Sequence, residues 1–239
     1  MRIASILAAT AALAATGCGR TNAQDGGPSV DRNYQVGSFQ SIEVAGPYEV
    51  EVRTGGAPSV TATGPEKLIE RLVVEVKGDR LMIHSRREGH FNWGSGRGTA
   101  RIRVTVPMLR AAAIAGSGGL TVDKINGDSF EGSIAGSGDL RLESVAVQAL
   151  KLAIGGSGSV HAAQGQARQA DLSIAGSGDI DSAGVRTDSA RISIAGSGNV
   201  NGHASRTADV SIMGSGDVSL TGGAKCNVSK SGSGEVHCS

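Results

Sequence analysis

Residues 173–200 read SIAGSGDIDSAGVRTDSARISIAGSGNV, so the pattern that begins at Ser173 returns at Ser193. The Gly-Ser-Gly triplet in this pattern recurs through the C-terminal half of the chain, first at intervals of 20 residues and then of 18. The triplets begin at Gly116, Gly136, Gly156, Gly176, Gly196, Gly214 and Gly232. A fixed period of this length is typical of a solenoid, in which each repeat is one coil stacked on the last.

Apolar residues hold fixed places around the triplets. An isoleucine stands two residues before each triplet except the last, and an aliphatic residue stands four residues after each first glycine. The two sets are Ile114, Ile134, Ile154, Ile174, Ile194 and Ile212, and Leu120, Leu140, Val160, Ile180, Val200, Val218 and Val236. Alternation of apolar with small or polar residues is typical of strands with one buried face, and the triplets interrupt any helical period.

Each repeat is therefore predicted to be a strand, a Gly-Ser-Gly corner, a second strand and a looser connection through positions such as Ile125, Val145 and Val185. Stacked at about 4.8 Å, such coils make an all-β fold, a single-stranded parallel β-helix with ladders of Ile and Val inside. Glycine suits the corner because a sharp bend between strands requires positive φ. The corner serines are expected to form a ladder of hydroxyls between coils.

The solenoid is predicted to fill residues 111–239, with a less regular β region over residues 34–110 as its N-terminal cap. Open solenoid ends expose unpaired strand edges that have to be covered. A short helix is expected at residues 65–72, because Pro65 suits a first helical turn. The alternating segments of the cap are residues 42–44, 48–52, 74–76, 81–83 and 102–106.

The C-terminal end carries two cysteines, Cys226 and Cys238, six residues before and six residues after Gly232. Both stand at inward-facing positions, so a disulfide between them would close the last coil, although two free thiols are the alternative. Lys230 takes the column held elsewhere by isoleucine, as expected where the interior meets water.

The N-terminus is typical of an exported protein. Residues 1–17 hold one early positive charge and a short apolar run, the pattern of a signal peptide. Ala15-Thr16-Gly17-Cys18 matches a bacterial lipobox, so Cys18 is the predicted lipidation site, with an ordinary secretory signal as the alternative. Residues 18–33 are expected to be a flexible tether to the membrane, and Gly19 favours the outer membrane.

Composition excludes several classes of function. The formal net charge is +1, which gives no electrostatic footprint for nucleic acid. The five histidines are scattered without ligand spacing, so no metal and no cofactor is predicted.

Acidic and amide residues recur directly after the corners, at Asp139, Asp179, Asn199, Asp217 and Glu235. Such a row could bind calcium, but Asp and Asn beside a glycine turn are more simply a solvated polar face. No histidine recurs beside the corner serines, so the repeat predicts architecture rather than nucleophiles. No catalytic residue is predicted.

The best candidate for contact with a partner is the segment of residues 86–98. It holds Phe91 and Trp93 beside Arg97, and exposed aromatics with arginine suit a protein or glycan ligand. The alternative is that Phe91 and Trp93 pack over the first coil as a lid.

The chain resembles a known family in three stretches: SFQSIEVAGPYEVEVRTG at residues 38–55, LMIHS at 81–85, and RIRVTVPMLRAAAIAGSG at 101–118 followed by repeated SIAGSGD. This layout is similar to the family "putative auto-transporter adhesin, head GIN domain", from about residue 35 to the end. The resemblance implies an exported β-solenoid of a bacterial envelope, and it brings no catalytic residues.

The expected function is therefore that of an outer-membrane lipoprotein whose solenoid binds an unknown protein or glycan ligand, as in adhesion, without catalysis. One alternative is a structural or regulatory module that faces the periplasm. A more distant alternative is a β-helix carbohydrate-active enzyme. The sequence leaves the oligomeric state open.

Overall fold

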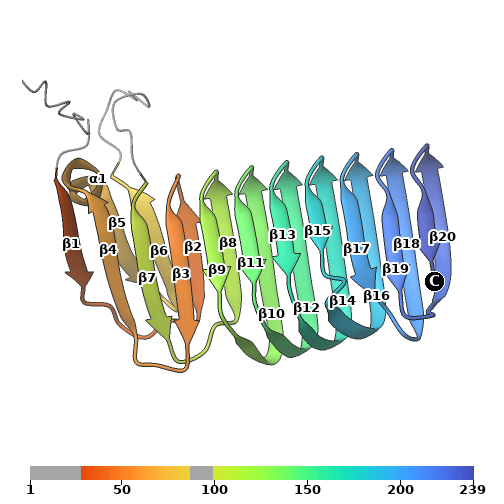
Figure 1. Ribbon diagram of the computed structural model, residues 1–239, viewed down its shortest axis with the longest axis horizontal. Coiled ribbons are helices and arrows are strands. Elements are labelled where there is room, and N and C mark those ends of the chain that lie inside the picture. Colours follow the sequence, from red (N-terminus) through yellow and green to blue (C-terminus); the bar gives the residue numbers. More distant parts are fainter. Residues whose placement is uncertain (1–27, 87–98) are drawn as a thin grey trace, which may run out of the picture.

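The computed structural model describes residues 28–86 and 99–239. At each Gly-Ser-Gly corner the chain turns and passes from one β-sheet to the other, so the coils stack into a solenoid with two walls (Figure 1). Along the repeats, neighbouring strands are parallel and equivalent residues of adjacent coils lie opposite each other, as Ile114 does to Ile134. The all-β parallel solenoid predicted from the repeat is confirmed.

The first wall has eleven strands and the second has ten. In spatial order the first wall is β1 (Ser29–Tyr34), β4 (Ser59–Pro65), β7 (Arg101–Val106), β3 (Glu49–Thr54), β9 (Gly119–Val122), β11 (Asp139–Leu142), β13 (Ser159–Ala162), β15 (Asp179–Asp181), β17 (Asn199–His203), β19 (Val218–Thr221) and β21 (Val236–Cys238). The second is β20 (Lys225–Gly232), β18 (Thr207–Gly214), β16 (Val185–Gly196), β14 (Gly165–Gly176), β12 (Val145–Gly156), β10 (Ile125–Gly136), β8 (Ala111–Gly116), β2 (Ser41–Ala45), β6 (Arg80–Ser85) and β5 (Leu72–Lys77).

The aliphatic columns form the core between the walls. The six isoleucines that precede the triplets, from Ile114 to Ile212, are each at most 3% exposed. The column after the corner, from Leu120 to Val218, is buried as fully. Full burial of one such side chain is worth about 1.5–3 kcal/mol relative to exposure. A thin core of medium-sized aliphatic residues thus stabilises a chain that has few aromatic residues.

The two glycines of each corner have different roles. The first has φ between +119° and +138°, the conformation that glycine adopts without strain. The second is required by stacking, since a Cβ on Gly138 would lie 2.5 Å from the carbonyl oxygen of Gly118. The corner serines link adjacent coils through their backbone N–H groups rather than through a ladder of hydroxyls. The N–H of Ser157, for example, donates to the Gly136 carbonyl oxygen at 2.9 Å, and the Ser157 residue is exposed to solvent.

The looser connection predicted after the second strand is wrong in one respect, because it is the first part of a long strand. β10, β12, β14 and β16 each run for 12 residues. Within β12, Val147 and Leu150 are buried while Gln148 and Ala149 between them both face outward. The strand therefore bends there, and Gln148 is skipped in the pairing register. Each of these four strands has a short arm before this bend and a long arm after it.

Residues 41–54 form a coil that the repeat columns did not reveal. β2 and β3 meet at Gly46, which has φ of +130° and lies against Gly116 of the next coil. Pro47 and Tyr48 stand where a regular corner has serine and glycine, so the triplet is lost from the sequence although the coil remains. This coil lies between the coil of β8 and β9 and the coil of β6 and β7, although both of those coils come later in the chain.

The N-terminal cap contains the predicted helix and ends in antiparallel strands. α1 (Glu66–Arg71) follows Pro65 and buries Ile69. β1 and β4 pair antiparallel in one wall, and β5 and β6 in the other, so the cap interrupts the parallel stacking of the coils. No helix among residues 28–86 and 99–239 is long and apolar enough to cross a membrane.

The tether predicted over residues 18–33 is too long at its C-terminal end. β1 begins at Ser29 and pairs with β4, with Val30 and Tyr34 packed against the core. Its polar residues suggested a linker, but they face solvent from an edge strand, where the Thr61 hydroxyl donates to the Asn33 side chain at 2.8 Å. Residues 18–27 lie outside the described residues.

Candidate functional site

Several residues singled out from the sequence lie outside the described residues: Cys18, and the contact candidates Phe91, Trp93 and Arg97. β6 and β7 pair with β2 and β3, so the stretch that holds the second group joins two strands whose neighbours in the next coil are joined by the short corner at Gly46.

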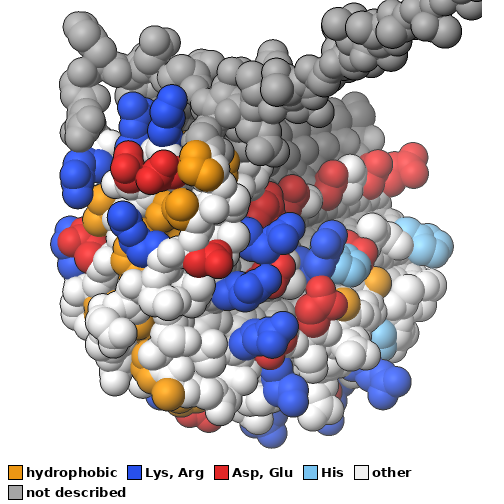
Figure 2. Space-filling view, turned by 60° about the vertical axis from the view of Figure 1, so that its left-hand side comes forward, with side chains coloured by type: hydrophobic (Ala, Val, Ile, Leu, Met, Phe, Trp, Pro, Cys, Tyr) orange, Lys and Arg blue, Asp and Glu red, His pale blue; other side chains and the backbone are white. Residues whose placement is uncertain are grey.

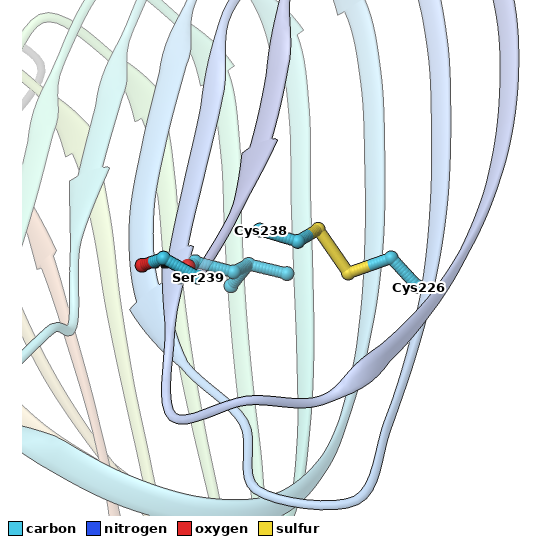
Figure 3. Close-up of a disulfide and its surroundings, with 4 residues drawn as sticks. Cys226, Cys238 and Ser239 are labelled. Atoms are coloured by element: carbon cyan, nitrogen blue, oxygen red, sulfur yellow. Dashed lines mark hydrogen bonds between the residues drawn. A yellow bond between two sulfur atoms is a disulfide. The ribbon is translucent and has the colours of Figure 1, made fainter.

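The C-terminal end is closed by a disulfide between Cys226 and Cys238 (Figure 3). The two residues lie on β20 and β21, which belong to different walls, so the bond ties the walls together across the end of the solenoid. Beside it, Val228 is 45% exposed although it stands in a core column, and Lys230 lies opposite Ile212. The interior of the solenoid is therefore partly open to solvent at this end, and the Lys230 ammonium group lies at the opening.

The acidic column is a row of hydrogen-bond acceptors for the next coil. Asp179 Oδ1 accepts from the backbone N–H of Asn199 at 3.1 Å, Asn199 Oδ1 from that of Asp217 at 3.2 Å, and Asp217 Oδ1 from that of Glu235 at 2.7 Å. Figure 2 shows acidic side chains in a row along the solenoid, with basic and acidic side chains intermixed below. No group of three potential metal-ligating residues occurs in the described part of the chain.

A step in the solenoid surface forms where the period shortens from 20 residues to 18. β16 has 12 residues and β18 has eight, and their pairing begins only at Ser189 and Thr207. The short arm at Val185–Asp188 therefore has no equivalent strand above it. The two missing residues of each later coil come from this arm.

His203 covers the exposed edge of the last short arm. The backbone N–H of Thr187 donates to His203 Nδ1 at 3.3 Å, and the Thr187 hydroxyl donates to the His203 carbonyl oxygen. The imidazole lies over Gly222, where an added Cβ would come within 2.8 Å of the ring. Because Nδ1 accepts a hydrogen bond, the neutral ring carries its proton on Nε2.

A groove of about 400 Å³ lies at this step. Its floor is formed by buried residues of three consecutive short arms, Val147, Ala167 and Thr187. Its other lining residues are polar or charged: Gln148, Gln166, Arg168, Arg186, Asp188, His203 and Ser205. We call this concavity the step groove.

The step groove has an excess of unpaired positive charge. No carboxylate oxygen of the described residues lies within 4.0 Å of the Arg168 or Arg186 guanidinium. The single acidic residue of the lining, Asp188, lies 4.0 Å from Arg206 Nε. The arrangement suits binding of an anionic, hydroxyl-rich ligand, because guanidinium groups pair with oxyanions and Gln amides both donate and accept.

Two side chains of the N-terminal region, Tyr48 and Glu75, have perturbed pKa values. Burial raises the pKa of Tyr48, although the hydrogen bond of 2.5 Å to the Ser85 hydroxyl acts in the opposite direction. The pKa of the exposed Glu75 carboxyl is lowered by its contact with Lys77 at 2.7 Å and then by His84 at 3.3 Å. The Glu75–His84 contact joins β5 to β6, and the Tyr48–Ser85 contact ties the corner after β2 to the end of β6, so both have a structural explanation.

Residues 38–224 match the protein family described as "Putative auto-transporter adhesin, head GIN domain". The match covers most of the chain, including the whole step groove. The chain belongs to this family. No curated protein matches it.

Solved structures support the fold of this head GIN domain protein. A "putative adhesin" from Bacteroides fragilis NCTC 9343 is similar with a TM-score of 0.80 and 22% identity, over 88% of this chain and 97% of that one. A "putative lipid binding protein" from Parabacteroides distasonis ATCC 8503 has a TM-score of 0.71 and 25% identity, over 89% and 97%. A "putative adhesin" from the same organism has a TM-score of 0.69 and 21% identity, over 89% and 98%.

Sequence reasoning missed the step groove. The signal was present in the shortening of the period after Gly196, together with side chains at the bend that do not repeat in type, such as Gln148, Arg168 and Asp188. The spacing alone does not tell which part of the coil loses two residues. That part decides where the step lies.

Proposed function

We propose that this head GIN domain protein is an exported lipoprotein of the cell envelope, anchored through Cys18, whose solenoid presents a non-catalytic surface for adhesion or ligand binding. The observation that carries the proposal is the step groove, where Arg168 and Arg186 have no carboxylate partner. Ligand binding by a rigid concave surface with unpaired polar groups is the behaviour that this geometry favours. The descriptions of the solved relatives as adhesins agree with it.

The groove favours binding over catalysis. Cleavage of a glycosidic bond by the usual route requires two carboxylates that flank the bond, and the groove lining offers only Asp188. That carboxylate faces Arg206, and His203 uses Nδ1 to accept the Thr187 N–H. With its Nδ1 lone pair occupied, His203 is not placed as a general base, and a single carboxylate does not make the pair that hydrolysis requires.

The C-terminal disulfide supports export. Disulfides persist in oxidising compartments such as the periplasm and the cell surface, and are rare in the bacterial cytosol. The bond between Cys226 and Cys238 spans the two walls at the exposed end of the solenoid. A chain that depends on this closure suits an envelope location.

The proposal is tested by adhesion of whole cells. Cells that carry the wild-type protein should adhere to a matrix coated with extracellular polysaccharide and protein better than cells from which the gene is deleted. Cells that carry Cys18→Ala should lose the advantage, because the unlipidated protein is not held at the membrane. Equal adhesion of wild-type and deleted cells on every matrix would contradict the proposal.

A further inference from the structure

We propose that the step groove binds an acidic polysaccharide, with Arg168 and Arg186 pairing with its carboxylate or sulfate groups. This inference rests on the proposed function, because it names the ligand class of the same surface.

The groove is a built feature rather than a chance hollow. Thr187 is 4% exposed, and two hydrogen bonds to His203 hold it in place. The ring of His203 is in turn fixed over Gly222. The floor strands pair in register, as Gln166 does with Arg186, so the side chains on the rim project from a rigid base.

The charges of the rim suit an anion that extends along the solenoid. Arg168 and Arg186 come from adjacent coils, which rise by about 4.8 Å, and they stand in columns two residues apart, so their guanidiniums can reach successive groups of a linear chain that crosses the coils obliquely. Both side chains are exposed, and neither has a carboxylate within 4.0 Å among the described residues. A guanidinium binds a carboxylate or a sulfate through two parallel hydrogen bonds.

The neutral groups of the rim suit hydroxyls. Gln148 and Gln166 each offer two N–H donors and a carbonyl acceptor, and Ser205 offers a hydroxyl. His203, whose Nδ1 accepts the Thr187 N–H, offers its Nε2–H. Sugar hydroxyls also both donate and accept, so they can satisfy this mixed set, whereas a ligand with anionic groups alone would leave the amide oxygens without donors.

A peptide is disfavoured because the strand edge at the step is already closed. A peptide that binds by β-augmentation needs free N–H and C=O groups on an exposed strand. Here the Thr187 N–H donates to His203, and the carbonyl oxygens of Thr187 and Asp188 accept from the N–H groups of Ser205 and Arg206 at 3.0 and 2.9 Å. The closed edge leaves side-chain contacts as the means of binding.

The test is equilibrium binding by the exported protein, purified from its cells. The probes are polygalacturonate for carboxylates, dextran sulfate for sulfates, dextran as the neutral chain, and polyglutamate as an acidic chain without sugars. We expect binding to one or both acidic polysaccharides that weakens as salt is raised, with none to dextran. The double variant Arg168→Gln/Arg186→Gln should lose at least about tenfold in affinity.

Arg191→Gln is the matched control. Arg191 is an exposed arginine on β16, the same strand as Arg186, but it lies on the long arm and does not line the groove. Its removal lowers the net charge by one, and the affinity should stay within about twofold. Thermal unfolding of each variant at the wild-type temperature verifies the fold.

Three results would overturn the inference. The first is that neither acidic polysaccharide binds, and the second is that Arg191→Gln loses as much affinity as the double variant. The third is that polyglutamate binds as tightly as the acidic polysaccharides and loses as much affinity in the double variant. The adhesion assay separates this inference from the proposed function. If wild-type cells keep their adhesion advantage while the double variant adheres equally well, the groove is not the ligand site but the adhesive function remains.

Discussion

Replacement of Gly156 by alanine tests the physical basis of the corners. Gly156 has φ of +137°, and a Cβ there would lie 2.2 Å from the carbonyl oxygen of Gly136. That oxygen accepts the N–H of Ser157 at 2.9 Å, so the methyl group would displace the hydrogen bond that joins the two coils at the corner. Backbone strain of about 1–3 kcal/mol and loss of one hydrogen bond of about 1 kcal/mol predict destabilisation by about 2–4 kcal/mol.

The neighbouring Gly155→Ala is the control. Gly155 is exposed, has no positive φ, and its nearest contact for an added Cβ is the Ile134 oxygen at 3.8 Å. Ala135 and Ala175 occupy the same column in the adjacent coils. We expect this variant to be unchanged or more stable by up to about 1 kcal/mol, because alanine restricts the unfolded chain.

Urea unfolding followed by circular dichroism measures both variants. A corner in the middle of the array joins coils on either side, so Gly156→Ala is also expected to broaden the transition as the stack loses cooperativity. Equal stability of Gly156→Ala and Gly155→Ala would refute the reasoning, because the two changes add the same methyl group one residue apart.

Three further predictions concern the ends of the solenoid and the cap. Cys226→Ser is expected to lower the free energy of unfolding by about 2–3 kcal/mol, since it opens the loop to Cys238, and a reducing agent should lower the melting temperature of the wild type but not of the variant. Lys230→Ile is expected to cause concentration-dependent association in sedimentation, because it removes the charge from an unpaired edge strand beside the exposed Val228; a variant that stays monomeric at high concentration argues against this role. Tyr48 has a pKa above its ordinary value of 10.0, so the folded state retains a proton that the unfolded state releases, and stability should fall as pH rises above 10.0. Tyr48→Phe removes the titrating group and should flatten that part of the profile, and an unchanged slope would point to another group.

The parts of the fold that depend on local periodicity could be predicted from the sequence. The recurrence of Gly-Ser-Gly with Ile154 and its equivalents predicts strands, corners and a parallel stack, because each coil repeats the same glycine turn beside the same buried side chains. The helix at Glu66–Arg71 was also predictable, since Pro65 and the residues after it favour one turn. The placement of Lys230 at an open end followed from its column alone.

The parts that depend on tertiary pairing could not be predicted. The coil around Gly46 lies between two coils that both come later in the chain, and only the pairing of β2 with both β6 and β8 reveals it. The step groove likewise depends on which arm of the coil is shortened. Its residues, such as Arg168, occupy an irregular column whose side chains are free to vary because they face solvent.

The most direct test of the central claim, that this solenoid is presented outside the cell, is labelling of intact cells with an amine reagent that cannot cross the outer membrane. Lys151 is a suitable reporter, because its side chain is 56% exposed on the solenoid wall. Mass spectrometry should find Lys151 labelled in intact cells while a periplasmic control protein stays unlabelled. Labelling of Lys151 only after the outer membrane has been opened would contradict the claim and would assign the protein to the periplasmic side.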